Sequence, residues 1–177
     1  MSSEQVLVPP LPKVLPIESM EAVVGEEFID LNGHMGAANY YLVFQQALPA
    51  LFRPLGFGAP YRQRGLTIFQ REAHISYERE LRLGDPISIR SWLVGYDERG
   101  LHHYHEMRKG EGGPLVATIE YLTVNVDLAT RRSAPFPHDV RARLETLVEA
   151  FRAIERPGQM GRSIALRLRK MSSPATS

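Results

Sequence analysis

The chain has 177 residues, which is the length of one ordinary domain and too short for two substantial ones. Its 44% apolar and 23% charged residues are typical of a globular protein and exclude a disordered or fibrous one. The net charge is only +1, whereas a nucleic-acid-binding domain normally carries a cationic surplus that neutralises phosphates. We therefore expect no nucleic-acid partner.

The absence of cysteine excludes disulfides, thiolate metal sites and a cysteine nucleophile. The first 20 residues contain neither a basic start nor a continuous apolar run, which argues against a signal peptide. No apolar stretch reaches the roughly 18 residues that a membrane-spanning helix needs. These features predict a cytoplasmic protein with no membrane partner.

Two tails flank the predicted domain. Residues 1–20 contain four prolines, which favour an extended N-terminal tail. Residues 157–177 contain basic but no acidic side chains and are expected to form a solvated, mobile C-terminal tail, with a short basic helix over 163–170 as the alternative. The domain is therefore predicted to span residues 21–156.

The first half of this domain is predicted to contain a strand and a central helix. Residues 22–29 have a strand pattern, and the turn formers of residues 30–34 follow it. Residues 37–52 are apolar on nearly every side of a helix, which is typical of a buried helix. Pro49 is expected to kink or break this helix.

The second half of the domain is predicted to be four strands and a closing helix. The strands are expected over residues 72–81, 87–96, 101–109 and 115–126, and the amphipathic helix over 139–155. Turn residues between successive strands favour an antiparallel meander. Such a sheet must cover one face with an apolar element, and the 37–52 helix is the best candidate. The predicted fold class is therefore α+β, with the sheet wrapped around a central helix as in the hotdog fold.

The run Asp30-Leu31-Asn32-Gly33-His34-Met35, followed by Asn39-Tyr40-Tyr41, resembles a motif of acyl-CoA thioesterases of the 4-hydroxybenzoyl-CoA type. The resemblance extends over about residues 22–137 and includes the run 127–137 at the end of the last strand. Within that family it is closest to the thioesterases of carnitine and betaine metabolism, which share the sequence Asn-Gly-His-Met. The chain departs from the family pattern at Phe28, where many members carry a second aspartate, and at Gly36 and Ala37, where many carry asparagines.

The resemblance implies thioester hydrolysis without a cofactor or metal, with Asp30 as nucleophile or general base. Gly36 and Ala37 begin the predicted helix, so their N–H groups lack intrahelical partners and could stabilise an oxyanion with the helix dipole. His34 could orient the carbonyl or a water. Taken without the resemblance, Asp30 and His34 are more typical of an ordinary turn before a helix than of a catalytic pair.

Further residues are assigned to the site by type and position. Glu72 and His74 share one strand face and could reach the active site from a neighbouring strand or subunit, although such a face usually contacts solvent. Asn39 and Tyr40 are assigned to substrate binding. Arg131 and Arg132 could hold coenzyme A phosphates through bidentate contacts.

A pair of histidines and a set of aromatic residues could also form binding sites. His103 and His105 lie two residues apart on a predicted strand and could share a metal ion, but no third ligand has suitable spacing, so no metal is expected. An aromatic cage for a quaternary ammonium group would draw on Trp92, Tyr40 or Tyr104, although packing roles are as natural for these side chains.

The sequence therefore predicts an acyl-CoA thioesterase acting on a small acyl group. The alternatives are a hotdog enoyl-CoA hydratase or dehydratase, whose Asp and His pair differs in spacing, and a non-catalytic acyl-CoA-binding module. The resemblance also implies a homodimer or homotetramer, and pairing would cover an exposed sheet edge.

Overall fold

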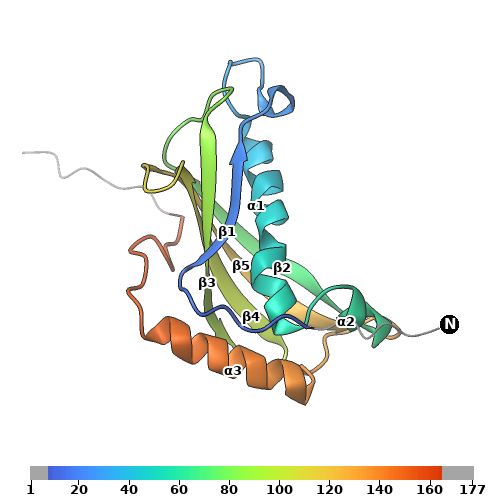
Figure 1. The fold of residues 1–177 in the computed structure, drawn as a ribbon. Coiled ribbons are helices and arrows are strands. Elements are labelled where there is room, and N and C mark those ends of the chain that lie inside the picture. Colours follow the sequence, from blue (N-terminus) through green and yellow to red (C-terminus); the bar gives the residue numbers. More distant parts are fainter. Residues whose placement is uncertain (1–7, 165–177) are drawn as a thin grey trace, which may run out of the picture.

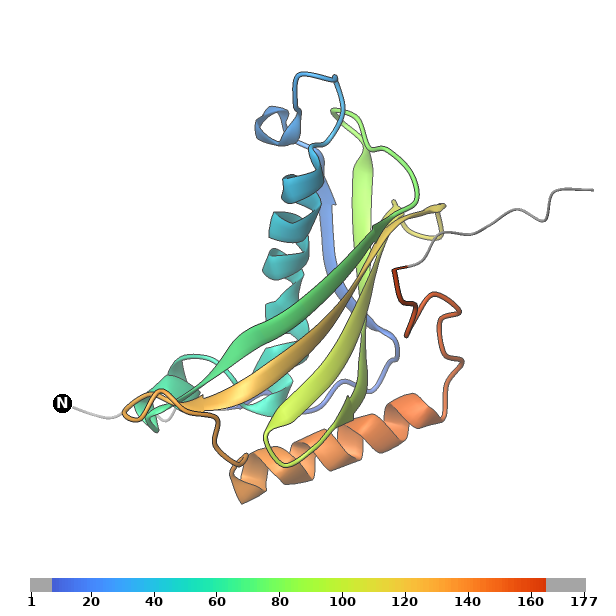
Figure 2. The ribbon, with the colours of Figure 1, turned by 180° about the vertical axis from the view of Figure 1, so that it is seen from behind.

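The computed structural model describes residues 8–164, so the remainders of both predicted tails, including most of the possible 163–170 helix, lie outside the described residues. It contains one antiparallel sheet with the strand order β1-β3-β4-β5-β2 (Figure 1). Helix α1 lies along one face of this curved sheet, and α3 crosses the end of the sheet at which α1 finishes (Figures 1 and 2). This is the predicted α+β hotdog architecture. None of the helices within residues 8–164 is long and apolar enough to cross a membrane.

The first strand lies earlier than the sequence predicts. β1 spans Ile17–Val23 and pairs with β3, whereas the predicted strand over 22–29 contains a 3-10 turn at Glu26–Phe28. The prolines that suggested a tail end at residue 16, immediately before the strand. Proline is compatible with the start of an edge strand, because no ladder hydrogen bond is lost there.

The predicted four-stranded meander is correct for only three strands. β3 (Pro86–Tyr96), β4 (Gly100–Lys109) and β5 (Leu115–Asp127) follow one another as predicted. β2 (Leu66–Tyr77) instead pairs with β5 at the far edge of the sheet and begins six residues before the predicted strand. The connection over residues 78–85 is too long for a tight hairpin, and it carries the chain across the sheet to β3.

Helix α1 spans Ala37–Phe52, as predicted, and buries its sheet-facing side. The side chains that are largely inaccessible to solvent are Tyr40, Val43, Phe44, Ala47, Leu48 and Leu51. The helix does not break at Pro49 but continues to Phe52 and then into a 3-10 turn at Arg53–Leu55. Pro49 lies in the last turn of α1, where few helical hydrogen bonds remain to be lost.

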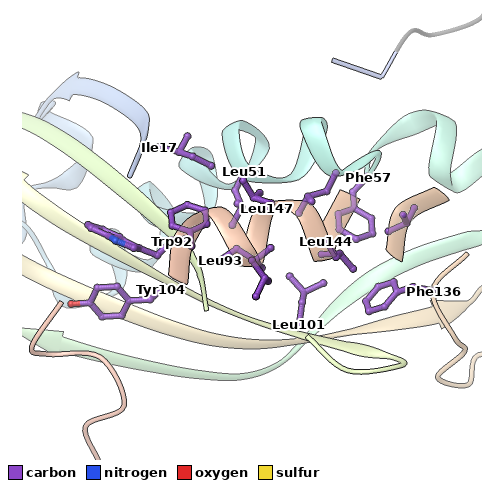
Figure 3. Close-up of a cluster of buried hydrophobic side chains, with 14 of the residues drawn as sticks. Ile17, Leu51, Phe57, Trp92, Leu93, Leu101, Tyr104, Phe136, Leu144 and Leu147 are labelled. Carbon is purple, nitrogen blue, oxygen red and sulfur yellow. The ribbon is translucent and has the colours of Figure 1, made fainter. Parts of the chain in front are cut away.

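A second helix pair closes the end of the sheet. The short α2 (Ala59–Gln63), which the sequence did not predict, precedes β2, and α3 (His138–Arg152) packs mainly on β3. The predicted apolar stripe of α3 is buried against the ends of α1 and the sheet (Figure 3). Trp92 and Tyr104 belong to this cluster, with their ring centroids 5.8 Å apart.

Candidate active site

A tight loop presents Asp30 beside the start of α1. The Asp30 N–H donates to the His34 carbonyl at 2.9 Å, and the Gly33 N–H returns to the Asp30 carbonyl at 3.0 Å. Gly33 has a φ of 77°, which favours glycine at this position. One oxygen of the Asp30 carboxylate accepts the Asn32 N–H at 2.8 Å and lies 3.8 Å from Nδ1 of His34. About a third of each of the Asp30 and His34 side chains is exposed, so both are accessible to a ligand.

The carboxylate of Asp30 lies close to the N-terminus of α1. A Cβ atom built on Gly36 would lie 3.7 Å from Oδ2 of Asp30, which is van der Waals contact, so the carboxylate lies directly beside the residue that precedes α1. The Gly36 N–H already donates to the Phe28 carbonyl at 3.0 Å, which removes it from the pair of predicted oxyanion donors in this conformation. No hydrogen-bond acceptor is found for the Ala37 N–H among the described residues, so Ala37 remains available as a donor.

The two predicted substrate-binding residues of α1 have structural partners. The Asn39 side-chain amide donates to the Phe28 carbonyl at 2.8 Å and thereby fixes the loop to the helix. Tyr40 is 3% exposed, and its hydroxyl accepts the Leu81 N–H at 3.1 Å. Burial raises the pKa of the Tyr40 hydroxyl. Tyr40 is therefore a core residue in this structure, and its assignment to substrate binding stays a prediction.

Glu72 does not join the Asp30 loop within one chain. It lies with His74, His102 and Glu120 around a cavity of about 400 Å³, on the sheet face opposite α1. In that cavity Nε2 of His102 contacts the Glu120 carboxylate at 2.5 Å. The structure therefore favours the solvent-face reading of Glu72 over the catalytic one.

A large cavity, of about 990 Å³, lies between the C-terminal half of α1, α2 and the first residues of β2. Its aromatic walls are formed by Phe52, Phe57, Tyr61 and Phe69. Its polar walls are formed by Gln45, Thr67, Gln70 and Thr123. The predicted cage residues Trp92 and Tyr104 lie instead in the cluster beneath α3. Sequence reasoning missed this cavity, because its lining comes from four separate stretches of chain with no shared motif.

Arginines surround the mouth of this cavity. The guanidinium of Arg131 lies 5.2 Å from the ring centre of Phe69, which lines the cavity, and Arg53 and Arg62 line it directly. Arg132 follows Arg131 in the same exposed turn. Arg131 thus lies beside the cavity lining, and its contact with a substrate stays a prediction. Arg53 and Arg62 were not singled out from the sequence.

His103 and His105 both point into the sheet core rather than toward water. Nδ1 of His103 lies 2.7 Å from Nε2 of His105, and both rings are fully buried. Desolvation lowers the pKa of His103 well below its usual range and lowers that of His105 to about 3. Across residues 8–164, no cluster of three or more potential metal ligands surrounds these or any other histidines.

The sequence was compared with known proteins. A family model described as the thioesterase-like superfamily matches residues 24–144. A betainyl-CoA thioesterase of Pseudomonas aeruginosa is 36% identical over 151 residues, covering 85% of this chain and 95% of that protein. An L-carnitine dehydrogenase/betainyl-CoA thioesterase of Agrobacterium fabrum is 32% identical over 75% of this chain, which corresponds to only 27% of that longer protein.

Solved structures give the same result. A Pseudomonas putida KT2440 protein described as a thioesterase has a TM-score of 0.73 and 32% identity, covering 88% of this chain and 99% of that one. A Staphylococcus aureus protein solved in complex with CoA has a TM-score of 0.73 and 30% identity, covering 84% of this chain and 94% of that one. The chain therefore belongs to the thioesterase-like superfamily with the hotdog fold, and it is an acyl-CoA thioester hydrolase.

Proposed function

We propose that the chain hydrolyses a small acyl-CoA thioester to the free acid and CoA, with Asp30 as the catalytic carboxylate. The observation that carries the proposal is the position of Asp30, partly exposed and beside the first free N–H of α1. A carboxylate and an unpaired donor at a helix N-terminus are the two groups that attack on a thioester carbonyl requires.

Two routes fit this geometry. Asp30 either attacks the carbonyl carbon, forming a mixed anhydride that water then hydrolyses, or removes a proton from a water that attacks directly. In both routes the C–S bond breaks, and CoA leaves as a thiolate that takes up a proton. The Ala37 N–H and the partial positive charge of the α1 N-terminus stabilise the oxyanion, while His34 orients the attacking group.

We further propose that each site is shared by two subunits. Asp30 precedes the N-terminus of α1, whereas the cavity is lined by Gln45 to Phe52 of the same helix, about 12 to 22 Å further along its axis. Within residues 8–164, β2 has one edge without a partner strand, and its Tyr77 end is tied to the start of α1 by a hydrogen bond to the Ala37 carbonyl. Antiparallel pairing of two β2 strands would bring the Asp30 loop of one subunit beside the cavity of the other.

The proposed acyl group is betainyl, as in the name of the Pseudomonas aeruginosa relative. The trimethylammonium group of this substrate cannot donate or accept a hydrogen bond and is held best by aromatic faces. The cavity lining offers two solvent-accessible aromatic side chains, Phe52 and Phe69, for that purpose, with the buried Phe57 and Tyr61 packed behind them. Arg131, whose guanidinium lies over Phe69 of the cavity lining, and Arg132 would bind the phosphates of coenzyme A.

The test is release of free thiol from betainyl-CoA and from 3,3-dimethylbutanoyl-CoA, in which carbon replaces the charged nitrogen. We expect wild type to prefer betainyl-CoA, and Asp30→Asn to lose at least about 100-fold in kcat with the fold retained. Glu26→Gln, which removes one charge from the same loop, is the control and should remain active. Turnover by Asp30→Asn at the wild-type rate would contradict the catalytic assignment. Binding of CoA without turnover of any ester would favour a non-catalytic module.

The phosphate contacts are tested separately by replacing Arg131 and Arg132 with alanine. The double variant should raise KM for the CoA ester far more than for the pantetheine ester, which lacks the nucleotide phosphates. An equal rise for both esters would refute the contact.

A further inference from the structure

A continuous line of polar side chains crosses the sheet beneath α1 and ends in the wall of the large cavity. It consists of Ser19 on β1, Ser91 on β3, His105 and His103 on β4, and Thr123 on β5. The successive distances are 2.5 Å between the serine hydroxyls, 2.6 Å from Ser91 to Nδ1 of His105, 2.7 Å between the imidazoles, and 2.8 Å from Nε2 of His103 to the Thr123 hydroxyl. We call these five residues the sheet relay.

The sheet relay can be hydrogen-bonded in only two directions. Burial keeps both imidazoles neutral, so each ring has one N–H and one lone pair. In the first direction, Thr123 donates to His103, His103 to His105, His105 to Ser91, and Ser91 to Ser19. In the second direction every one of these bonds is reversed. The first requires N–H at Nδ1 of both histidines, and the second requires N–H at Nε2 of both.

The ends of the sheet relay favour the first direction. The Ser19 hydroxyl lies 3.2 Å from the Ile17 carbonyl, so the last proton of the first direction has an acceptor. In the second direction the unpaired proton belongs to Thr123, in the cavity wall. Among residues 8–164, the only hydrogen-bond partner found for the Thr123 hydroxyl is Nε2 of His103. A buried hydroxyl proton without an acceptor is costly.

We propose that the sheet relay is a positioning device that turns the oxygen lone pairs of Thr123 toward the cavity and thereby favours a cationic acyl group. Thr123 is the residue of the sheet relay that lines the cavity, and the two histidines and two serines act through it. A hydroxyl oxygen facing the cavity attracts a trimethylammonium group, whereas a hydroxyl proton there would repel it. The selectivity part rests on the proposed function, because it requires the cavity to hold the acyl group.

The direction is tested by ¹⁵N NMR of the histidine side chains in the resting enzyme, because protonated and unprotonated ring nitrogens have well-separated shifts. In wild type we expect N–H at Nδ1 of both His103 and His105. Ser91→Ala removes the partner of Nδ1 of His105, and an unpaired lone pair is less costly than an unpaired N–H. Both histidines should therefore move their proton to Nε2. Thr123→Val removes the partner at the other end and should leave both protons at Nδ1.

The effect on selectivity is measured with the same variants. Ser91→Ala, and also Ser19→Ala at the partly exposed end, should lower kcat/KM for betainyl-CoA by roughly three- to tenfold and leave that for 3,3-dimethylbutanoyl-CoA unchanged. Ser88→Ala is the matched control, because Ser88 is also buried on β3 but bonds the Gly110 carbonyl outside the relay. It should change neither the tautomers nor the preference between the two esters.

Two results would overturn the proposal. N–H at Nε2 of His103 or His105 in wild type, or unchanged tautomers in Ser91→Ala, would refute the direction of the relay. An equal loss of activity on both esters would refute its role in selectivity. Failure of wild type to hydrolyse betainyl-CoA would instead contradict the proposed function, and the tautomers, read without substrate, would still decide the direction.

Discussion

At the scale of single residues, the surroundings of a side chain decide its role more than its type does. His102, His103 and His105 are close in the sequence, yet His102 contacts Glu120 on the outer face, while the other two are enclosed beneath α1. The alternation of a strand predicts that His103 and His105 share a face. The alternation does not show which face of β4 is buried, because polar or charged side chains occur on both faces of this strand.

The two buried histidines make the free energy of unfolding depend on pH. Their pKa is lower in the folded than in the unfolded state, where it is near 6.5, so below that pH the unfolded chain binds protons that the folded chain does not. The stabilisation is complete above pH 6.5 and decreases as the pH falls toward about 3, the folded pKa of His105. Each histidine should contribute a slope of about 1.4 kcal/mol per pH unit in the free energy of unfolding.

Chemical unfolding between pH 7 and 4.5 measures this slope. His105→Gln should reduce it by one histidine's share relative to wild type, while His138→Gln, at the exposed start of α3, should leave it unchanged. A wild-type slope retained by His105→Gln would show that carboxylates, not the buried imidazoles, account for the acid sensitivity.

At the scale of elements, the sequence predicts those segments whose own pattern matches their surroundings. The bounds of α1 were predicted correctly, and β3, β4, β5 and α3 to within a few residues, because each has an apolar face that meets one partner layer. The predicted bounds of β1 and β2 were wrong by several residues, because these are the two edge strands of the sheet. Phe69 and Tyr77 on β2 are 38% and 49% exposed, so that strand lacks the strict alternation that burial on one face imposes.

Pro49 should limit the stability of α1. The helix continues through this residue, although proline lacks the N–H that would bond the Gln45 carbonyl and its ring crowds the preceding turn. Because Pro49 is exposed, Pro49→Ala removes no core contact and should raise the free energy of unfolding by about 1–3 kcal/mol. Denaturant unfolding checks this, with Gln46→Ala on the same exposed helix surface as the control. A loss of stability would show that the proline ring packs more favourably than the restored hydrogen bond.

At the scale of the whole molecule, the candidate site is in two parts, the Asp30 loop before the start of α1 and the cavity along its C-terminal half. The Asp30 loop was predictable because its motif is contiguous. The cavity was not, because its walls are assembled from α1, α2, β2 and β5, and residues such as Gln45 and Thr123 become neighbours only in the folded sheet. The aromatic residues considered for a cage, Trp92, Tyr40 and Tyr104, lie in the core clusters, in agreement with their alternative role in packing.

Mixing two inactive variants tests whether the site is completed by a second subunit. Asp30→Asn lacks the carboxylate but keeps the cavity, and Pro49→Trp fills the cavity from an exposed helix position but keeps Asp30. Each should be inactive alone. After joint unfolding and refolding at equal amounts, half of the dimers contain both variants, and in each of these one of the two sites combines a wild-type carboxylate with a wild-type cavity. Thiol release should therefore recover to about a quarter of the wild-type rate. If Asp30 and the cavity of the same chain form one active site, the mixture will remain as inactive as its components.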